Sequence, residues 1–343
     1  MAKRERIVVI FPGRGSYAAK ELGYLSRHHG DRLEMVRRLD AMRVEAGATP
    51  TLELDGQDRF SPSQHLPGRN ASNLIYTAAL SDFAAIDRER YEVVAVCGNS
   101  LGWYLSLAGA GALSLEDGAH LVDTMGALME AEAVGGQLLY PVSHDDWTVD
   151  AEARAATLAT VADTANAFLS IDLAGTLVLA GDKAAVTHLQ SALPPVDGNP
   201  PIQLPKHGAF HTPLLEDVTK MAQDALPAAM FAVPKVPMVD GRGVIWSPDS
   251  TDVEALYDYT LFTQIVETYD FARSVEVACK EFAPDRLMLM GPGSSLGAPI
   301  AQTLIRHRWN GLTSREDFMS AQADDPFLIA LGRGEQRSLG VGD

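Results

Sequence analysis

The sequence predicts an α/β fold built on a mainly parallel sheet with helices on both faces. Three largely apolar runs, at 7–11, 91–97 and 286–290, have the length of buried strands, and the first two are rich in β-branched residues. The first two end at glycine-containing turns and lead into stretches with helical periodicity. Strands separated by helices are typical of β-α-β units, whose strands pair in parallel.

A smaller α+β unit is predicted between residues 135 and 205, where the elements become shorter. We expect, in order, a strand at 137–142, a helix at 151–167, a strand at 176–180, a helix at 183–193 and a final strand.

These patterns divide the chain into two units. Residues 1–134 and 206–331 form the predicted large domain, and residues 135–205 form a small subdomain inserted into it. The last stretch, 332–343, has few apolar residues to bury, so we expect it to be a loose C-terminal tail.

Composition excludes several classes of partner. The 343 residues include 28 basic and 45 acidic side chains, a net charge of −17, so we expect no nucleic-acid partner. No apolar run approaches the roughly 18 residues of a membrane span, and the basic start of the chain precedes an apolar run of only strand length. Cys97 and Cys279 are too few for a disulfide framework. We expect a cytoplasmic protein without a membrane partner.

The strongest local motif is G-N-S-L-G at residues 98–102, directly after the second predicted strand and before a helix. A sharp strand-to-helix turn of the form G-x-S-x-G lifts its serine hydroxyl out of the sheet edge. The following helix N-terminus supplies a backbone N–H, here that of Leu101, to a developing oxyanion. This context predicts that Ser100 is a nucleophile.

A nucleophilic serine needs a base, and nine histidines are available. His211 follows a Pro-rich loop and precedes a predicted helix near Pro213, which makes it a modest favourite on spacing alone. No spacing typical of metal ligands is present, so we expect no metal site.

With these motifs in order, the sequence resembles the malonyl-CoA:acyl carrier protein transacylases and the acyltransferase domains of polyketide synthases. The family motifs F-P-G-Q-G-S, G-H-S-L-G, N-S-P-G-Q-x-V-I-A-G, P-F-H-S-P-L, S-N-x-x-G and G-P-G correspond here to residues 11–16, 98–102, 172–181, 209–214, 239–243 and 291–293. The resemblance implies a large α/β-hydrolase-like domain with an inserted ferredoxin-like subdomain.

The resemblance also implies a mechanism. Ser100 would attack an acyl-CoA thioester, with His211 as its base, and the acyl group would pass to the phosphopantetheine thiol of an acyl carrier protein in fatty acid or polyketide biosynthesis. The oxyanion would lie between the backbone N–H groups of Leu101 and Arg14, the latter at the family's glutamine position. The family orients its histidine with a carbonyl near the S-N pair, so Asp240 becomes a candidate for that role. No cofactor is implied beyond the CoA and phosphopantetheine of the substrates.

Departures from the family pattern concern the acyl pocket. Members that take malonyl groups hold the free carboxylate with an arginine in L-V-x-x-R-G, where this chain has Met125. Because methionine carries no charge and a buried unpaired carboxylate is costly, we expect an uncharged acyl group. Asn99, and Ser72 or a neighbour, replace further polar family residues, and Trp103 follows the serine turn. They indicate a remodelled pocket, although Trp103 suits core packing equally well.

Three alternatives remain open from the sequence. The Arg14 side chain could reach a malonyl carboxylate from the opposite side of the pocket. The same scaffold could act as an acyl hydrolase that removes acyl groups from carrier proteins, because hydrolysis requires only that water reach the acyl-serine. The third alternative is a non-catalytic docking protein for carrier proteins, which the presence of both Ser100 and His211 disfavours.

Overall fold

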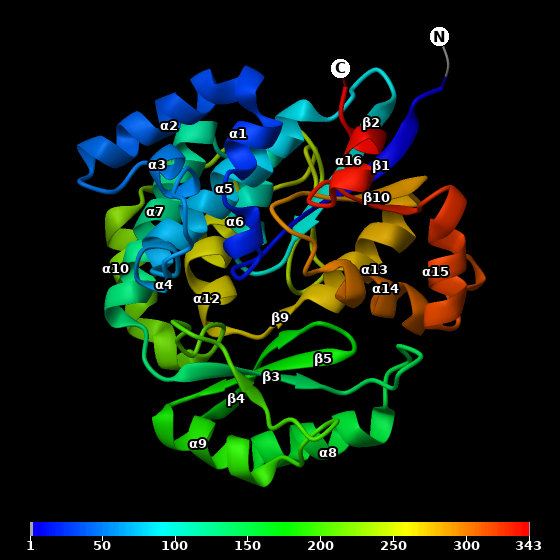
Figure 1. Cartoon of the computed structure of the whole chain (residues 1–343). Coiled ribbons are helices and arrows are strands. Elements are labelled where there is room, and N and C mark those ends of the chain that lie inside the picture. The colour runs from blue at the N-terminus through cyan, green and yellow to red at the C-terminus, as the bar shows by residue number, and fades with distance from the viewer. Residues whose placement is uncertain (1–2, 343) are drawn as a thin grey trace.

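The computed structural model describes residues 3–342 and confirms the α/β class (Figure 1). The larger sheet has the order β11-β10-β1-β2-β7-β8, and its pairs are parallel except β7 with β8. Its strands are β1 (Glu5–Phe11), β2 (Tyr91–Gly98), β7 (Met238–Val239), β8 (Ile245–Trp246), β10 (Arg286–Leu289) and β11 (Leu328–Ala330).

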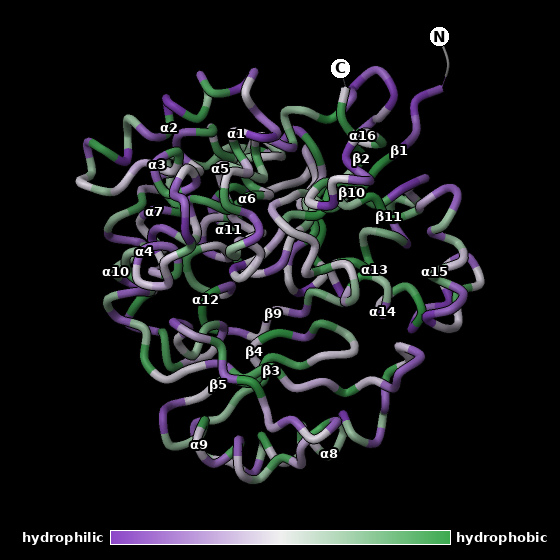
Figure 2. The backbone as a smooth tube through the Cα atoms, viewed as in Figure 1, coloured by the Kyte–Doolittle hydropathy of each residue, from purple (hydrophilic) through white to green (hydrophobic). Residues whose placement is uncertain are grey.

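Burial of the central strand on both faces explains its uninterrupted apolar sequence. All five residues of the apolar run 7–11 in the central strand β1 are fully buried. Helices α6 (Leu101–Gly109) and α13 (Phe271–Phe282) both pack against β1 and β2. A strand covered on both faces reads as a continuous apolar run, not as an alternating one. Figure 2 shows this apolar character concentrated in the strands, while α2 and α15 carry many hydrophilic residues.

A helical layer beside the sheet includes α2 (Leu33–Glu45), α5 (Gly68–Ala85) and α7 (Leu115–Glu132). Glycines let α5 and α7 approach closely: a Cβ added to Gly68 would lie 2.6 Å from the carbonyl oxygen of Gly126. A side chain at either glycine would push the helices apart. This packing fixes α7, whose inner face carries Met125.

The smaller sheet has the order β6-β3-β5-β4-β9. Its strands are β3 (Gly136–Pro141), β4 (Ala167–Asp172), β5 (Thr176–Gly181), β6 (Ile202–Gln203) and β9 (Tyr269–Asp270). Helices α8 (Ala151–Ala162) and α9 (Lys183–Ala192) cover one face (Figure 1). Within 136–203 the order strand, helix, strand, strand, helix, strand with a 4-1-3-2 sheet is ferredoxin-like.

Two details of this unit differ from the prediction. The helix expected at 151–167 ends at Ala162, and strand β4 begins at Ala167 after a turn in which Asn166 has a φ of 57°. The alanine-rich sequence concealed this boundary. Strand β9 also joins the small sheet from far along the chain, where it pairs in parallel with β4.

The predicted loose C-terminal tail is wrong for the described residues 332–342. Helix α16 (Gly334–Gly340) forms there, and the Arg337 guanidinium donates a 2.7 Å hydrogen bond to the fully buried Asp82 carboxylate. Val341 forms a β-bridge with Ile86. The buried ion pair of Arg337 with Asp82 therefore holds this segment in place. The hydropathy pattern of the sequence gives no sign of this pair. Asp343 of the predicted tail, and residues 1 and 2 of the predicted large domain, lie outside the described residues.

The remaining helices complete the large unit. They are α1 (Tyr24–His28), α3 (Thr51–Asp55), α4 (Pro62–His65), α10 (Glu216–Ala225), α11 (Val253–Asp258), α12 (Gln264–Val266), α14 (Gly297–Arg306) and α15 (Arg315–Asp324), with a π-helical turn (Tyr259–Thr263) between α11 and α12. No helix between residues 3 and 342 has both the length and the apolar character needed to cross a bilayer.

Candidate active site

Ser100 occupies the sharp turn between β2 and α6, with a φ of 54° and a ψ of −109°. This region is unfavourable for a residue with a side chain. The flanking glycines are required by close packing: a Cβ on Gly98 would lie 2.3 Å from the carbonyl oxygen of Gly102, and a Cβ on Gly102 would lie 2.4 Å from that of Phe11. The motif that singled out Ser100 therefore has the predicted strand-turn-helix geometry.

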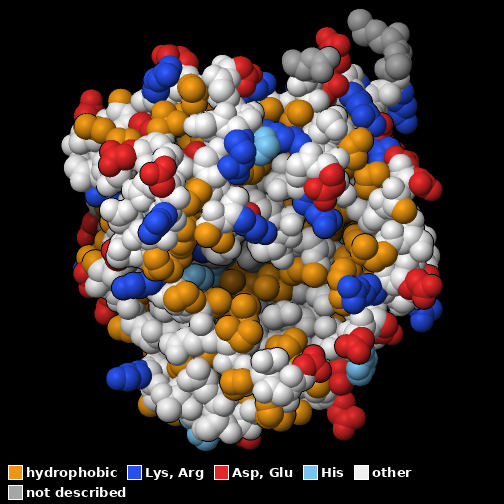
Figure 3. Space-filling model, viewed as in Figure 1, with side chains coloured by type: hydrophobic (Ala, Val, Ile, Leu, Met, Phe, Trp, Pro, Cys, Tyr) orange, Lys and Arg blue, Asp and Glu red, His pale blue; other side chains and the backbone are white. Residues whose placement is uncertain are grey.

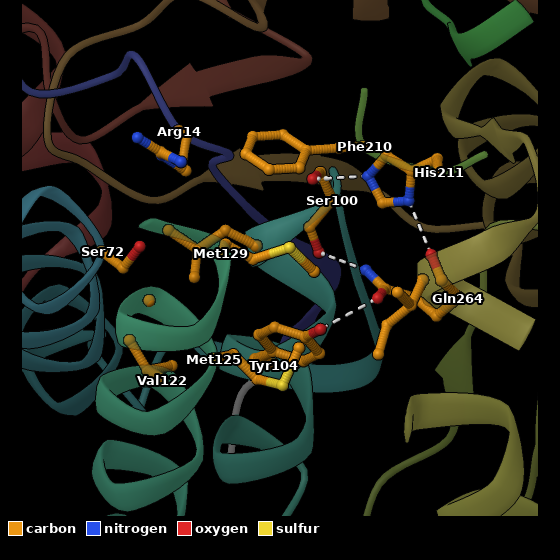
Figure 4. Close-up of a pocket in the computed structure, with 13 residues that line it drawn as sticks. Arg14, Ser72, Ser100, Tyr104, Val122, Met125, Met129, Phe210, His211 and Gln264 are labelled. Carbon is orange, nitrogen blue, oxygen red and sulfur yellow. Dashed lines mark hydrogen bonds between the residues drawn. The ribbon is translucent and has the colours of Figure 1, made fainter. Parts of the chain in front are cut away.

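His211 lies directly against this serine (Figure 4). Its Nε2 is 2.7 Å from Ser100 Oγ, and its Nδ1 is 2.6 Å from the carbonyl oxygen of Gln264. A carbonyl oxygen can only accept, so Nδ1 carries the proton and Nε2 is free to accept from the serine hydroxyl. Burial lowers the pKa of His211 to about 4, against the opposing effect of its bond to Gln264. The ring is therefore neutral at pH 7, the form that a base requires.

Gln264 was missed by the sequence analysis. It opens the short helix α12, which ends two residues later, so its carbonyl lies in a last turn where intrahelical partners run out. Its side chain also spans the site: Nε2 donates to the carbonyl oxygen of Ser100 at 3.3 Å, and Oε1 accepts from the Tyr104 hydroxyl at 3.0 Å. The sequence signal was weak: a glutamine in a mainly apolar segment that also contains Thr260 and Thr263.

Asp240 does not orient His211, so that expectation is wrong. Its fully buried carboxylate accepts hydrogen bonds from the Arg242 side chain at 2.7 Å, from Trp246 Nε1 at 3.1 Å and from the backbone N–H of Val244 at 3.0 Å. An aspartate in a turn preferentially binds the N–H groups that follow it, and here it closes the turn between β7 and β8.

The two predicted oxyanion donors lie beside the serine. Leu101 is the first residue of α6, and Arg14 belongs to the turn after β1. Both residues line the same cavity as Ser100. Within residues 3–342, neither backbone N–H donates a hydrogen bond. Two unused donors beside a nucleophile suit an oxyanion, and this role remains a prediction.

A cavity of about 460 Å³ of empty space opens next to Ser100 and is largely apolar. Met125 lines it and is only 2% exposed, and Val122 and Met129 line it from the same helix, α7 (Figure 4). Its full lining is Arg14, Ser72, Ser100, Leu101, Tyr104, Val122, Met125, Gly126, Met129, Phe210, His211, Gln264 and Ile265. We call it the acyl pocket; Ser72 and Met125 lie in it, as the sequence suggested.

Arg14 is the one charged side chain of the acyl pocket among the described residues. Its Nη2 donates to the carbonyl oxygens of Leu66 and Lys206 at 3.3 and 3.2 Å, and its guanidinium carbon lies 5.4 Å from the centre of the Phe210 ring. Its Nε is buried with no partner among the described residues. Burial lowers the pKa of Arg14 to about 10, opposed by Glu130, so the side chain is charged at neutral pH.

Two predicted pocket residues lie elsewhere. Trp103 is fully buried and lines none of the described cavities near Ser100; its Nε1 donates to Thr260 Oγ1 at 3.1 Å, and its ring meets Tyr259 edge-on. The pocket assignment of Trp103 is therefore wrong, because α6 turns this side chain into the core and Tyr104 toward the cavity. Asn99 lines a second cavity, which Ser100 also lines.

This second cavity, a cleft open to solvent with about 1170 Å³ of empty space, lies between the units built on the two sheets. Most of its lining is apolar, including Leu139, Ile171 and Val178 from the small sheet, and Ser100 is part of the lining. Figure 3 shows apolar side chains gathered in the hollow between the two parts of the molecule. The acyl pocket and this cleft share Arg14, Ser100 and Phe210, so the serine hydroxyl is accessible from both.

No group of three or more His, Cys, Asp or Glu side chains among residues 3–342 is arranged to hold a metal ion.

The chain resembles known proteins in sequence and fold, although no protein-family model matches it. It is 25% identical over 312 residues to the phenolphthiocerol synthesis polyketide synthase Pks15/1 of Mycobacterium marinum, a match spanning 87% of this chain but only 14% of that protein. It is 24% identical over 292 residues to the malonyl CoA-acyl carrier protein transacylase of Salmonella typhimurium, covering 84% of this chain and 89% of that one. The crystal structure of the malonyl-CoA:acyl carrier protein transacylase of Xanthomonas oryzae superposes with a TM-score of 0.75 at 21% identity, over 98% of both chains.

Proposed function

We propose that this chain, an acyltransferase of the family of malonyl-CoA:acyl carrier protein transacylases and polyketide synthase acyltransferase domains, moves an acyl group from CoA to the phosphopantetheine thiol of an acyl carrier protein. The observation that carries the proposal is the 2.7 Å contact between Ser100 Oγ and His211 Nε2. It leaves the serine poised to lose its proton to a neutral base.

The reaction would proceed in two halves. His211 Nε2 takes the Ser100 proton as Oγ bonds to the thioester carbon, and the N–H groups of Leu101 and Arg14 stabilise the oxyanion. The carbon–sulfur bond breaks, and CoA leaves as a thiol with the proton from His211. The phosphopantetheine thiol then gives its proton to His211 and attacks the acyl-serine, and Oγ regains the proton. Gln264 keeps the ring in the required tautomer throughout.

Met125 favours an uncharged acyl group such as acetyl, propionyl or longer. Its side chain stands on α7 in the wall of the acyl pocket, and Val122 and Met129 extend the same apolar surface. A carboxylate placed against this wall would lose its hydration without gaining a partner, at a cost of several kcal/mol.

A second candidate, transfer of a malonyl group, is favoured by Arg14. A buried guanidinium whose Nε has no partner is suited to bind a carboxylate. The Phe210 ring, whose centre is 5.4 Å from the Arg14 guanidinium carbon, is seen between the labelled Arg14 and Ser100 in the view of Figure 4.

Intact mass spectrometry of the protein with a panel of acyl-CoAs tests these proposals, with Ser100→Ala as the control. Acetyl or longer neutral adducts that vanish in the control support the leading proposal, whereas a preferred malonyl adduct supports the Arg14 candidate. Addition of a carrier protein then separates transfer from hydrolysis, in which free acid forms instead. No adduct and no turnover with any donor would leave only a docking role.

A further inference from the structure

A chain of buried hydrogen bonds runs from the small sheet to the backbone next to His211. The carbonyl oxygen of Phe210 lies 2.7 Å from Ser170 Oγ on β4. Ser170 Oγ is 2.6 Å from Gln137 Nε2 on β3, and Gln137 Oε1 is 2.7 Å from Nδ1 of His207. Ser170 is fully buried and Gln137 is 2% exposed.

The Phe210 carbonyl, at the end of this series of hydrogen bonds, determines which atom donates in each of them. The Phe210 carbonyl can only accept, so the single Ser170 proton is donated to it. Ser170 Oγ must then accept from the Gln137 amide, which turns the Gln137 oxygen toward His207. His207 Nδ1 therefore carries a proton. Burial, followed by the charge of Arg14, lowers the pKa of His207 to about 3, so its ring stays neutral and the direction does not change at physiological pH.

His211 needs such an anchor because its backbone is strained, with a φ of 58°. A residue with a side chain remains in this region only where its surroundings hold it. The neighbouring bonds of Phe210 N–H to the Gly208 carbonyl and of Thr212 Oγ1 to the Ala209 carbonyl stay within the loop, whereas the Ala209 N–H bonds the Val134 carbonyl, just before β3, at 2.7 Å. The hydrogen bond from Ser170 Oγ to the Phe210 carbonyl connects the loop to strand β4 of the small sheet.

We propose that Ser170 and Gln137 are positioning residues for His211: they hold the carbonyl before it and thereby fix the approach of Nε2 to Ser100 Oγ. The histidine is then held from two directions, by Gln264 at Nδ1 and by the small sheet through Phe210. This inference rests on the proposed roles of Ser100 and His211 but not on the identity of the acyl group.

Labelling of Ser100 by a small alkyl fluorophosphonate tests the inference without an acyl donor. In that reaction the Oγ–phosphorus bond forms, the phosphorus–fluorine bond breaks, fluoride leaves and His211 takes the serine proton. Ser170→Ala removes the donor to Phe210. Gln137→Glu replaces the amide donor by a carboxylate, which draws the Ser170 proton away from the Phe210 carbonyl.

Tyr140→Phe is the matched control. Tyr140 lies on the same strand as Gln137, and its buried hydroxyl donates to the Pro194 carbonyl at 3.0 Å, away from His211. We expect the labelling rate to fall about tenfold in Ser170→Ala and Gln137→Glu, since one hydrogen bond contributes up to about that factor, and to stay unchanged in Tyr140→Phe. With an acyl-CoA donor, the same two variants should lower kcat while leaving KM unchanged.

Thermal unfolding of all three variants separates positioning from general destabilisation. A loss of labelling in Ser170→Ala and Gln137→Glu, with a Tm no lower than that of Tyr140→Phe, supports the inference. A Ser170→Ala rate within twofold of the parent overturns it while leaving the proposed function intact. Absence of Ser100 labelling in the parent protein would overturn the inference and the proposed function together.

Discussion

Ser100 and His211, whose side chains meet at 2.7 Å, both have a left-handed backbone, with φ values of 54° and 58°. The serine is held by a turn between a strand and a helix of the large unit, and the histidine by a loop anchored on both units. Two strained residues in direct contact indicate that the fold stores local strain in order to bring these atoms together.

Replacement of Ser100 by glycine should stabilise the protein while abolishing acylation. Glycine adopts the φ of 54° without strain, so the free energy of unfolding should rise by about 1 kcal/mol. Urea denaturation measures this change. The control, Ser106→Gly in the helix that follows Ser100, should lower stability, because Ser106 lies within α6 and bonds the Gly102 carbonyl. Equal losses in both variants would contradict the strain argument.

The acylation rate should rise with pH around pH 4 and then stay level through neutrality. Burial lowers the pKa of His211 to about 4, so the ring is neutral, and able to accept the Ser100 proton, above that value. Because the unfolded chain binds this proton near pH 6.5, stability should fall as the pH drops from 6.5 to 4. The initial acylation rate between pH 3.5 and 8 checks this. A midpoint near 6.5 would show that the ring is solvated.

Met125→Arg should shift donor preference toward malonyl-CoA by tenfold or more, because a guanidinium on α7 would face the acyl pocket. The ratio of malonyl to acetyl adduct, measured by intact mass, gives the effect. Met125→Leu keeps the pocket apolar and should retain the parent preference. The prediction fails if the parent already prefers malonyl and Arg14→Gln abolishes that preference.

Asp82→Ala should destabilise the protein by about 3–5 kcal/mol, because it leaves the buried Arg337 without its carboxylate. Asp82 also accepts from the Tyr24 hydroxyl at 2.8 Å and the Gly291 N–H at 2.7 Å, and it binds His29 Nε2 at 2.8 Å. Chemical denaturation measures the loss. Removal of the exposed pair of Arg333 with Glu335 by Arg333→Ala should change stability by less than about 1 kcal/mol.

Apolar runs and local turns predicted most of the fold. The buried parts of strands β1, β2 and β10 are apolar runs because the sheet covers them, and the glycines around Ser100 are required by contacts of the turn itself. Each of these features depends on a few consecutive residues, so it can be recognised in the sequence. The ferredoxin-like order was implied by resemblance, while β4 stayed hidden after an alanine-rich helix.

What the sequence did not reveal depends on contacts between distant segments. His211 is oriented by the backbone carbonyl of Gln264. Because every residue has such a carbonyl, no residue type in the sequence identifies this partner. The Trp103 side chain points into the core because of the way α6 packs. The Asp240 carboxylate accepts hydrogen bonds within its own turn because of the way the β7–β8 turn folds. The C-terminal helix is fixed by Asp82, about 255 positions away. Only the three-dimensional structure brings these partners together.

The order of strands in the large sheet has a consequence for the growing chain on the ribosome. Strand β1 is made before both of its neighbours: one of its edges pairs with β2 and the other with β10, at residues 286–289. Until that late segment leaves the exit tunnel, the nascent protein carries an apolar strand with an open edge, the feature that invites pairing with other chains. Synthesis must therefore pass residue 289 before the central strand is protected on both sides.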